Sequence, residues 1–303
     1  MSDIKEAKRP RLIENMAVGM LLRGYGVAPS LMHKIRPRIV KRTWKVAHAW
    51  RKALRANGKI LLGSDADEHA IDQFGLGVLD NMQLYMAGLV AGSCMSRSAL
   101  VSRIGSFSGV EDYRAMRRAH PRGAVIISIH MGDFESAAAI IADHDAKMNV
   151  LYRRDHIDRL ERIRAQARKR LDVRAHAVDD GMATWLGLKD ALGRNEVVAL
   201  HGDRVQPGQT GTNVNVLGHQ TVLPIGPFKL AYAAEAPLVP VFNWRMDSGL
   251  FAMKIGAPIE LDDRVMRDPE NSTAVLSWAE MLGDHIRSFP EQWLNVHPVW
   301  APR

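Results

Sequence analysis

The chain has 303 residues, of which 47% are hydrophobic, so it can bury a sizeable core and disorder is excluded as the default reading. Its one cysteine, Cys94, excludes an internal disulfide framework and favours a reducing compartment. The apolar stretch at residues 15–32 is interrupted by Arg23 and Pro29 and lacks a cleavage-site pattern, so the sequence predicts neither a membrane span nor a signal peptide.

The formal net charge of +8 is concentrated in one segment. Residues 15–64 contain 11 Lys and Arg but no Asp or Glu, so acidic residues outnumber basic ones in the rest of the chain. Trp44 and Trp50 lie among these basic residues, a pattern typical of a segment that rests on anionic lipid headgroups. A nucleic acid could use the same charge, and a solvated face of a helical hairpin is the third interpretation.

In chain order, the sequence predicts three regions. Residues 1–12 are polar and charged, which is typical of a flexible tail. Residues 13–103 repeat apolar residues at a spacing of three to four, which predicts a basic helical region that associates with a membrane. Residues 104–303 predict an α/β domain, because short apolar strands alternate with helix-length segments after residue 120.

Within the α/β domain, the apolar runs predict strands near 123–129, 148–152, 173–178, 196–201, 237–243 and 250–255. The intervening segments predict helices near 134–143, 156–171, 181–193, 226–235 and 272–288. The helix at 156–171 has one apolar face, and its other side carries six basic residues: Arg159, Arg162, Arg164, Arg168, Lys169 and Arg170. This second side is expected to be an exposed basic surface.

The stretch "AVIISIHMGDFE", residues 124–135, places titratable groups where a buried strand ends. Ligand crevices form at the carboxyl ends of strands in open α/β sheets, so His130 lies where sites tend to occur. A helix that begins near Asp133 places Glu135 in its first turn, within reach of the imidazole, as an orienting partner for a general base. A core histidine without a function is the plain alternative. Metal ligation by His130, Asp133, Glu135 and His144 is another, although this spacing matches no standard signature.

Four blocks carry a resemblance to a known family. "IHMGDFESAA" is similar to the H-x4-D/E motif of the bacterial lipid A biosynthesis acyltransferases, related to glycerolipid acyltransferases, in which H-x-G-N-W-E is the usual form. "NVLYRRDHIDRLERIRAQARKRLDVR" resembles the family's Tyr-Arg strand end and basic helix. "LKDALGRNEVVALHGDRVQPGQTGTNVNVLG" and "LPIGPFKLAYAAEAPLVPVFNWR" resemble the segments that follow. The likeness runs in order over about residues 110 to 260.

The resemblance implies roles for six residues. His130 would be the general base and Glu135 its partner, while Arg153 would position the thioester carbonyl and stabilise its oxyanion. Asp133, Asp203 and Arg204 would bind substrate or shape the site. Two of these depart from the usual pattern, because Asp133 stands where Asn is usual and Arg204 stands where Gln often follows the aspartate.

The resemblance also implies an α/β fold with a glycerolipid-acyltransferase-like central sheet, flanked by helices and preceded by an N-terminal helical region. The expected reaction moves a fatty acyl chain from acyl carrier protein or acyl-CoA to a hydroxyl or amine of a lipid or glycolipid. It implies no metal and no bound cofactor. The other expected partner is an anionic membrane surface, with the protein peripheral on the cytoplasmic face of the inner membrane, and no nucleic acid is expected.

Two other functions remain open from the sequence. One is a metal-dependent hydrolase that uses His130, Asp133 and Glu135. The other is a non-catalytic basic protein that binds nucleic acid, although the aromatic content is only 6% and no recognised nucleic-acid motif is present.

Overall fold

The central element is one mixed sheet with strand order β1-β9-β8-β2-β5-β3-β4. The computed structural model describes residues 3–63, 65–135, 137, 141, 147–206 and 209–300, with side chains described from residue 15 onward. The strands are β1 (Ile104–Ser108), β2 (Ala124–Ser128), β3 (Met148–Tyr152), β4 (Arg174–Ala177), β5 (Val197–His201), β8 (Leu238–Arg245) and β9 (Phe251–Ile255). All neighbours pair in parallel except β8 with β9. The α/β fold with a central sheet is therefore confirmed.

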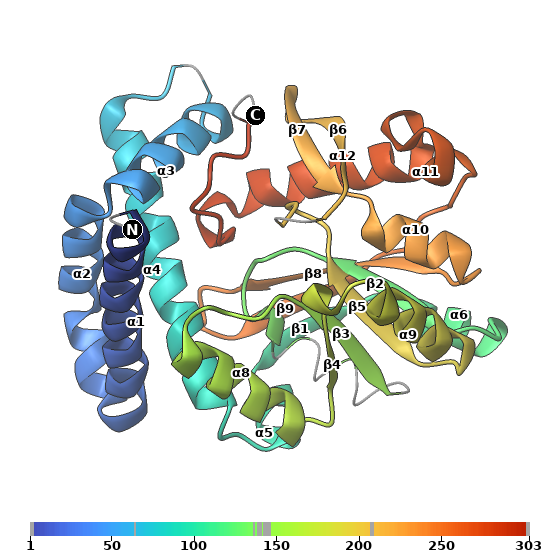
Figure 1. Cartoon of the computed structure of the whole chain (residues 1–303), viewed down its shortest axis with the longest axis horizontal. Helices are drawn as coiled ribbons and strands as arrows, with labels where there is room; N and C mark the ends of the chain where they lie inside the picture. Colours follow the sequence, from blue (N-terminus) through green and yellow to red (C-terminus); the bar gives the residue numbers. More distant parts are fainter. Residues whose placement is uncertain are drawn as a thin grey trace.

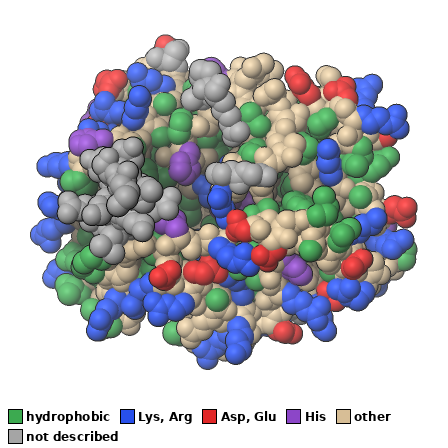
Figure 2. Space-filling view, in the orientation of Figure 1, with side chains coloured by type: hydrophobic (Ala, Val, Ile, Leu, Met, Phe, Trp, Pro, Cys, Tyr) green, Lys and Arg blue, Asp and Glu red, His purple; other side chains and the backbone are tan. Residues whose placement is uncertain are grey.

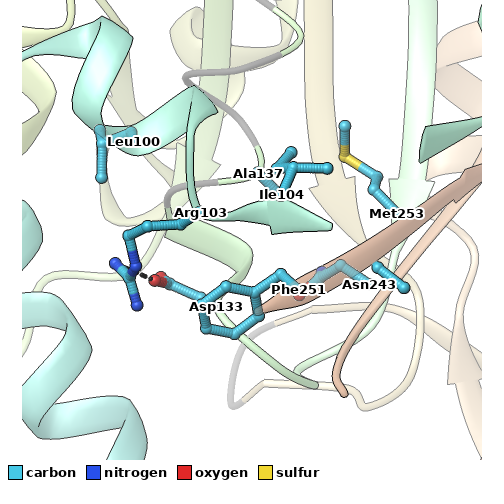
Figure 3. A pocket seen from close by; sticks show the side chains of 9 residues that line it. Leu100, Arg103, Ile104, Asp133, Ala137, Asn243, Phe251 and Met253 are labelled. Atoms are coloured by element: carbon cyan, nitrogen blue, oxygen red, sulfur yellow. Dashed lines mark ion pairs between the residues drawn. The ribbon is translucent and has the colours of Figure 1, made fainter. Parts of the chain in front are cut away.

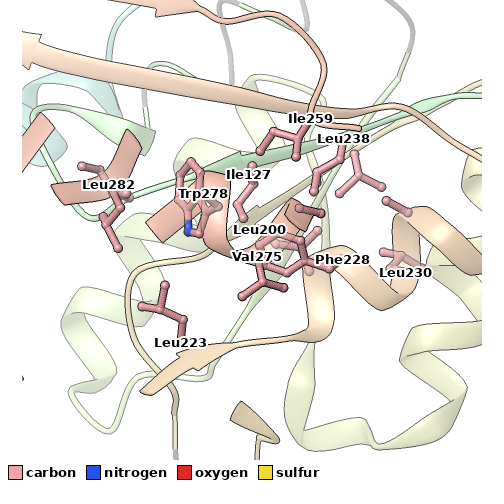
Figure 4. Close-up of a cluster of buried hydrophobic side chains, with 14 of the residues drawn as sticks. Ile127, Leu200, Leu223, Phe228, Leu230, Leu238, Ile259, Val275, Trp278 and Leu282 are labelled. Atoms are coloured by element: carbon pink, nitrogen blue, oxygen red, sulfur yellow. The ribbon is translucent and has the colours of Figure 1, made fainter. Parts of the chain in front are cut away.

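Helices cover both faces of the sheet (Figure 1). The helices of this part are α5 (Arg97–Val101), α6 (Val110–Ala119), α8 (Asp158–Arg170), α9 (Met182–Gly193), α10 (Gly226–Ala233), α11 (Arg264–Arg267) and α12 (Thr273–Ser288). Because side chains alternate along a strand, Val125 and Ile127 pack toward α9, α10 and α12, whereas Ala124 and Ile126 pack toward α5 and α6. The first of these two cores contains the large buried side chains that Figure 4 shows.

The six predicted strands correspond to β2, β3, β4, β5, β8 and β9, but the sequence did not reveal three others. β1 is a short edge strand with mostly partly buried or exposed residues. β6 (Gly211–Val216) and β7 (His219–Pro224) form a separate hairpin. Both of its turn residues, Leu217 (φ 57°) and Gly218 (φ 79°), have the positive φ that a type I′ turn requires, and leucine gives no sequence signal for such a turn.

The N-terminal helical region is also confirmed. It contains α1 (Asp3–Val27), α2 (Pro29–Val46), α3 (His48–Leu61) and α4 (Glu68–Gly92), which lie together at one side of the sheet in Figure 1. Their own core includes Trp44, which packs against Gly75, where a Cβ atom would overlap the indole ring. Trp44 is therefore a core residue, and the expectation that it lies on the basic surface is wrong; Trp50 is exposed.

Some expectations fall on residues that the structure leaves undescribed. α1 begins at Asp3, but residues 1 and 2 and the side chains of 3–14 lie outside the described residues, so the flexible tail at 1–12 stays a prediction. Most of the helix expected at 134–143 also lies outside them. In the described part of the chain, no helix is both long enough and apolar enough to cross a bilayer.

The packing of α12 gives a stability prediction. Trp278 is fully buried, stacks on Phe242 at a ring distance of 5.5 Å and donates from Nε1 to the Gly202 carbonyl at 2.9 Å. We expect Trp278→Ala to lower the free energy of unfolding by about 3–5 kcal/mol in urea titrations, because it leaves a large cavity and an unpaired carbonyl. Leu276→Ala, on the exposed side of the same helix, should change it by less than about 0.5 kcal/mol. Equal losses for the two variants would contradict this assignment of the core.

Candidate active site

The main chain around His130 is fixed on both sides. His130 lies two residues beyond the end of β2, and its carbonyl accepts a hydrogen bond from the Leu294 backbone at 2.8 Å. Gly132 then turns the chain with φ 63°, against Asn243, where a Cβ atom would collide with the amide oxygen. Only glycine meets both demands, so this turn sets the direction in which the imidazole points.

The partner of the imidazole is Asp203. Its Oδ1 atom lies 2.8 Å from His130 Nδ1, and its Oδ2 atom accepts from the His130 backbone N–H at 3.2 Å and from Trp293 Nε1 at 2.9 Å. Because β2 and β5 are parallel neighbours, with Ser128 opposite His201, the residues that follow them meet at one edge of the sheet. The sequence predicted Glu135 in this place, and the structure corrects that expectation: Asp203 holds the ring.

The charges of this pair follow from burial. Desolvation, with help from the Arg204 guanidinium, lowers the pKa of His130 below its ordinary value, although Asp203 acts in the opposite direction. Burial alone would raise the pKa of Asp203, but His130 and Arg204 hold it well below its usual range. The pair is therefore a carboxylate and a neutral imidazole at neutral pH. An ionised carboxylate only accepts, so Nδ1 carries the ring proton and Nε2 is left as the nitrogen that can take one.

Two aromatic side chains fix the ring from its other sides. His201 stacks on His130 with ring centroids 3.9 Å apart, and Phe134 meets both rings edge to face at 5.4 and 4.9 Å. Burial lowers the pKa of His201 well below its ordinary value, and a charge on His130 would lower it further. His201 is thus a neutral ring that restricts the motion of His130 without adding charge.

Glu135 belongs to a neighbouring network. Its Oε1 atom lies 2.9 Å from Arg164 Nε and accepts from the Tyr85 hydroxyl at 3.3 Å. Arg164 also binds Asp155 at 3.0 Å and the Tyr85 hydroxyl at 2.8 Å. Tyr85 stacks on Phe134 with centroids 4.9 Å apart, so this network reaches the imidazole through an aromatic ring and joins α4 and α8 to the site.

Asp133 points toward Arg103, as Figure 3 shows. It is buried and forms an ion pair with Arg103 at 3.1 Å, and Arg103 in turn lies over the Phe251 ring. A buried carboxylate beside a guanidinium stabilises the turn after β2 as long as both partners are present. The role of Asp133 in binding substrate or shaping the site stays a prediction.

The arginines expected from the sequence to serve the site lie in different surroundings. Arg153 follows β3, with its side chain 40% exposed and its Nε 3.9 Å from Asp179. Arg164 and Arg168, expected on an exposed basic face, are instead turned inward: Arg168 binds Glu161 at 2.8 Å and lies over the Tyr152 ring. Arg204 is mostly buried next to Asp203 and faces the same cavity as His130. The exposed part of α8 keeps Arg159, Arg162, Lys169 and Arg170.

His130 and Arg204 line a cavity of about 1400 Å³, larger than the 300–1,000 Å³ typical of small-molecule sites. Two neighbouring residues of β5 both line this cavity. Leu200 packs with the core under α9, α10 and α12, and Ala199 packs with the core on the side of α5 and α6. Since adjacent side chains point to opposite faces, the cavity extends over both faces of the sheet past its strand ends. Figure 2 shows a hollow near the centre of this side of the molecule, where histidine, basic and hydrophobic side chains meet.

The metal set considered from the sequence is not gathered in the structure. Asp133 and Glu135 bind arginines, and His144 lies outside the described residues. In the described part of the chain, the side chains that come close enough to share an ion are His130, His201 and Asp203, whose ligand atoms lie within 4.8 Å of one another. The hydrogen bond between His130 and Asp203 already occupies one ligand atom of each.

Sequence reasoning missed Tyr85, Arg164, His201 and Trp293 as parts of the site. Of these, only His201 carried a local signal, because it stands at a strand end two residues before Asp203. Tyr85 lies on α4 and Trp293 lies 90 residues beyond Asp203, so only the folded chain brings them to the imidazole.

A comparison with known proteins identifies the family of this chain. A profile of the bacterial lipid A biosynthesis acyltransferases matches residues 14–301, almost the whole chain. The chain belongs to this family. The resemblance read from the motifs is therefore confirmed.

Two curated relatives carry the name phosphatidylinositol mannoside acyltransferase. The protein of Mycolicibacterium smegmatis is 25% identical over 180 residues, which are 59% of this chain and 57% of that protein. The protein of Mycobacterium tuberculosis is 29% identical over 113 residues, which are 37% of this chain and 34% of that protein. The chain thus aligns with less than two thirds of the length of either relative.

The contacts in this member of the lipid A biosynthesis acyltransferase family predict which carboxylate controls the imidazole. Asp203 favours the charged ring, so Asp203→Asn should lower the pKa of His130 further. Glu135→Gln should leave it nearly unchanged, because Glu135 binds Arg164. Histidine-labelled NMR titration, with His130→Ala used to assign the signal, measures both. A larger shift in Glu135→Gln than in Asp203→Asn would contradict the site geometry.

Proposed function

We propose that the protein is an acyltransferase that moves a fatty acyl chain from an acyl thioester to a hydroxyl or amine of a lipid or glycolipid. The observation that carries the proposal is the His130 imidazole, held through Nδ1 by Asp203 in the lining of a cavity that extends toward two apolar cores. A base beside room for hydrocarbon chains suits acyl transfer to a lipid. Family membership supports the reaction class.

In this mechanism, Nε2 of His130 takes the proton from the acceptor as its oxygen or nitrogen attacks the thioester carbon. Asp203 stabilises the imidazolium that forms and keeps the ring in the correct tautomer. The tetrahedral intermediate then re-forms the carbonyl and breaks the carbon–sulfur bond, and the imidazolium returns its proton to the leaving thiolate. The direct transfer needs no nucleophilic side chain.

The donor in this proposal is acyl carrier protein or acyl-CoA. Arg153, at the cavity wall and partly exposed, is placed to meet an anionic part of the donor. α8 begins soon after Arg153 in the chain, and its exposed basic residues offer an electrostatic surface for an acidic carrier.

The acceptor in this proposal is a lipid or glycolipid. The two relatives are named for a mannoside of phosphatidylinositol, which supports a glycolipid class without defining this chain's acceptor. The size of the cavity and its extent over both faces of the sheet support it as well, because they leave room for the donor chain and a chain of the acceptor.

We place the protein as a peripheral protein on the cytoplasmic face of the inner membrane. Exposed apolar side chains of α1, α2 and α3, and of the residue that caps α3, support this proposal: Met16, Met20, Val27, Leu31, Val46, Trp50 and Leu62. Exposed basic residues lie among them, including Lys41 and Arg42 on α2. Apolar side chains among basic ones fit a surface of anionic headgroups.

One prediction of the proposed function concerns the general base. We expect wild-type protein to transfer a labelled acyl group from acyl carrier protein or acyl-CoA to extracted lipids, and His130→Ala to lower kcat by about 10²–10⁴-fold. Asp203→Asn should lose more activity than Glu135→Gln, with exposed Asp284→Asn as the control. Because burial lowers the pKa of His130, activity should fall only at pH values below about 6.5, as the ring becomes protonated.

Three results would count against the proposal. Activity that disappears on chelation would favour metal-dependent chemistry. Equal activity of wild type and His130→Ala would remove the base from the mechanism. Inactivity of wild type with both thioesters, across total lipid extracts, would contradict acyl transfer itself.

Another prediction of the proposed function concerns the membrane surface. The paired change Lys41→Glu and Arg42→Glu should weaken binding to phosphatidylcholine vesicles that contain phosphatidylglycerol by at least about tenfold, since each basic residue near the surface contributes about 1 kcal/mol. Trp50→Ala should weaken binding through lost apolar contact. The paired change Arg264→Glu and Arg267→Glu, at two exposed basic residues of α11, is the matched control, and vesicle co-sedimentation is the measurement. A charge reversal on α11 that weakens binding as much would place the membrane surface elsewhere.

A further inference from the structure

Arg204 is a mostly buried cation, and the hydrogen bonds of the site leave much of its guanidinium without a partner. Its Nε is fully buried without a hydrogen-bond partner, and its Nη1 reaches the Leu294 carbonyl only at 3.5 Å. Among the described residues, no carboxylate forms an ion pair with it, although Asp203 precedes it in the chain. The oxygens of Asp203 are already bound by His130 and Trp293.

A buried guanidinium without an ion-pair partner is costly, because desolvation disfavours the charged form unless an opposite charge lies nearby. The pKa of Arg204 is accordingly lowered by burial, with only partial compensation from Asp203. Its guanidinium lines the cavity that His130 faces. A group with five donors in a planar fork, facing a cavity and lacking a carboxylate partner, is suited to bind an anion there.

Arg153, the other arginine considered for this task, is a weaker fit. Its side chain is 40% exposed and lies 3.9 Å from Asp179, so solvent and a carboxylate both screen its charge. Preorganised charge stabilises an oxyanion best where water is excluded. Arg204 is mostly buried in the cavity wall and meets that condition better than Arg153.

We propose that Arg204 forms the oxyanion site of the acyl-transfer reaction: its guanidinium holds the negative charge that develops on the thioester carbonyl oxygen. This inference rests on the proposed function. When the acceptor forms its bond to the carbonyl carbon, the π pair moves to the oxygen, which accepts from the Arg204 N–H groups, while the acceptor proton goes to His130 Nε2. When the intermediate collapses, the carbonyl re-forms, the carbon–sulfur bond breaks and the thiolate takes the proton.

The same cation acts on the base. Arg204 lies close enough to lower the pKa of His130, which keeps the imidazole free to accept a proton. Arg164 acts on His130 in the same direction, Asp203 acts in the opposite direction, and His201, stacked on the ring, is held neutral by burial. Removal of the Arg204 charge should therefore raise the pKa of His130.

The kinetic test compares Arg204→Gln and Arg204→Lys with Arg287→Gln, an exposed control on α12. We expect Arg204→Gln to lower kcat by about 10²–10³-fold with little change in the KM for the donor, because an oxyanion site acts in the transition state. The acidic limb of its pH–rate profile should move to higher pH, and Arg204→Lys should restore part of kcat. A normal kcat with an unmoved pH profile, or a rise in KM alone, would overturn the inference.

A binding test decides the same point without turnover. A fatty-acid carboxylate imitates the oxyanion, and the fatty alcohol of equal length does not. In calorimetry, wild type should bind the carboxylate at least about tenfold more tightly, and Arg204→Gln should lose this preference while its affinity for the alcohol and its thermal unfolding stay close to wild type. Equal binding of the two probes by wild type, or an unchanged preference in Arg204→Gln, would overturn the inference.

The two tests separate this inference from the proposed function. Transfer that requires His130 but not Arg204 leaves the acyltransferase proposal intact and removes the oxyanion role. Wild type that transfers nothing defeats the proposed function, whereas the carboxylate preference still reports whether Arg204 holds an anion in the cavity.

Discussion

The hydrogen bond between His130 Nδ1 and Asp203 Oδ1 is the interaction on which the rest of the site depends. It exists because β2 and β5 are parallel neighbours, so that the residues beyond their carboxyl ends meet. The sheet order thereby decides which carboxylate reaches the imidazole. Gly132 and the chain around Leu294 fix the direction of the ring, and Trp293 fixes the carboxylate.

The other carboxylates near His130 are each paired with an arginine. Asp133 is paired with Arg103, and Glu135 is paired with Arg164, so neither competes with Asp203 for the imidazole. Tyr85 brings α4 into the second pair, which couples the N-terminal helices to the site through packed side chains. A change in the helical region can therefore alter the position of Phe134 and, through it, the base.

The sequence predicted the α/β class, six of the strands and the place of His130 because these follow from local patterns. It assigned the partner of His130 to Glu135, five residues away, because local reach was the only available criterion. The true partner depends on the order of strands in the sheet, which no local pattern specifies. Arg164 and Arg168 were predicted to be exposed because the helical repeat looks basic on that side. Arg164 instead turns inward to Glu135, and Arg168 turns inward to Glu161 of the same helix and to the Tyr152 ring. The sequence did not predict β1 or the β6–β7 hairpin, because these segments lack long apolar runs and the hairpin turn contains a leucine.

The central claim is that His130 and Asp203 act as one catalytic unit, and a double-mutant cycle tests it most directly. The rates of acyl transfer would be measured for His130→Ala, Asp203→Asn and the double variant under identical conditions. Residues that act together are strongly non-additive, so the double variant should be no slower than His130→Ala alone. If the rate losses of the two single variants multiply in the double variant, Asp203 acts independently of the imidazole. That result would contradict the claim that the two residues form one catalytic unit.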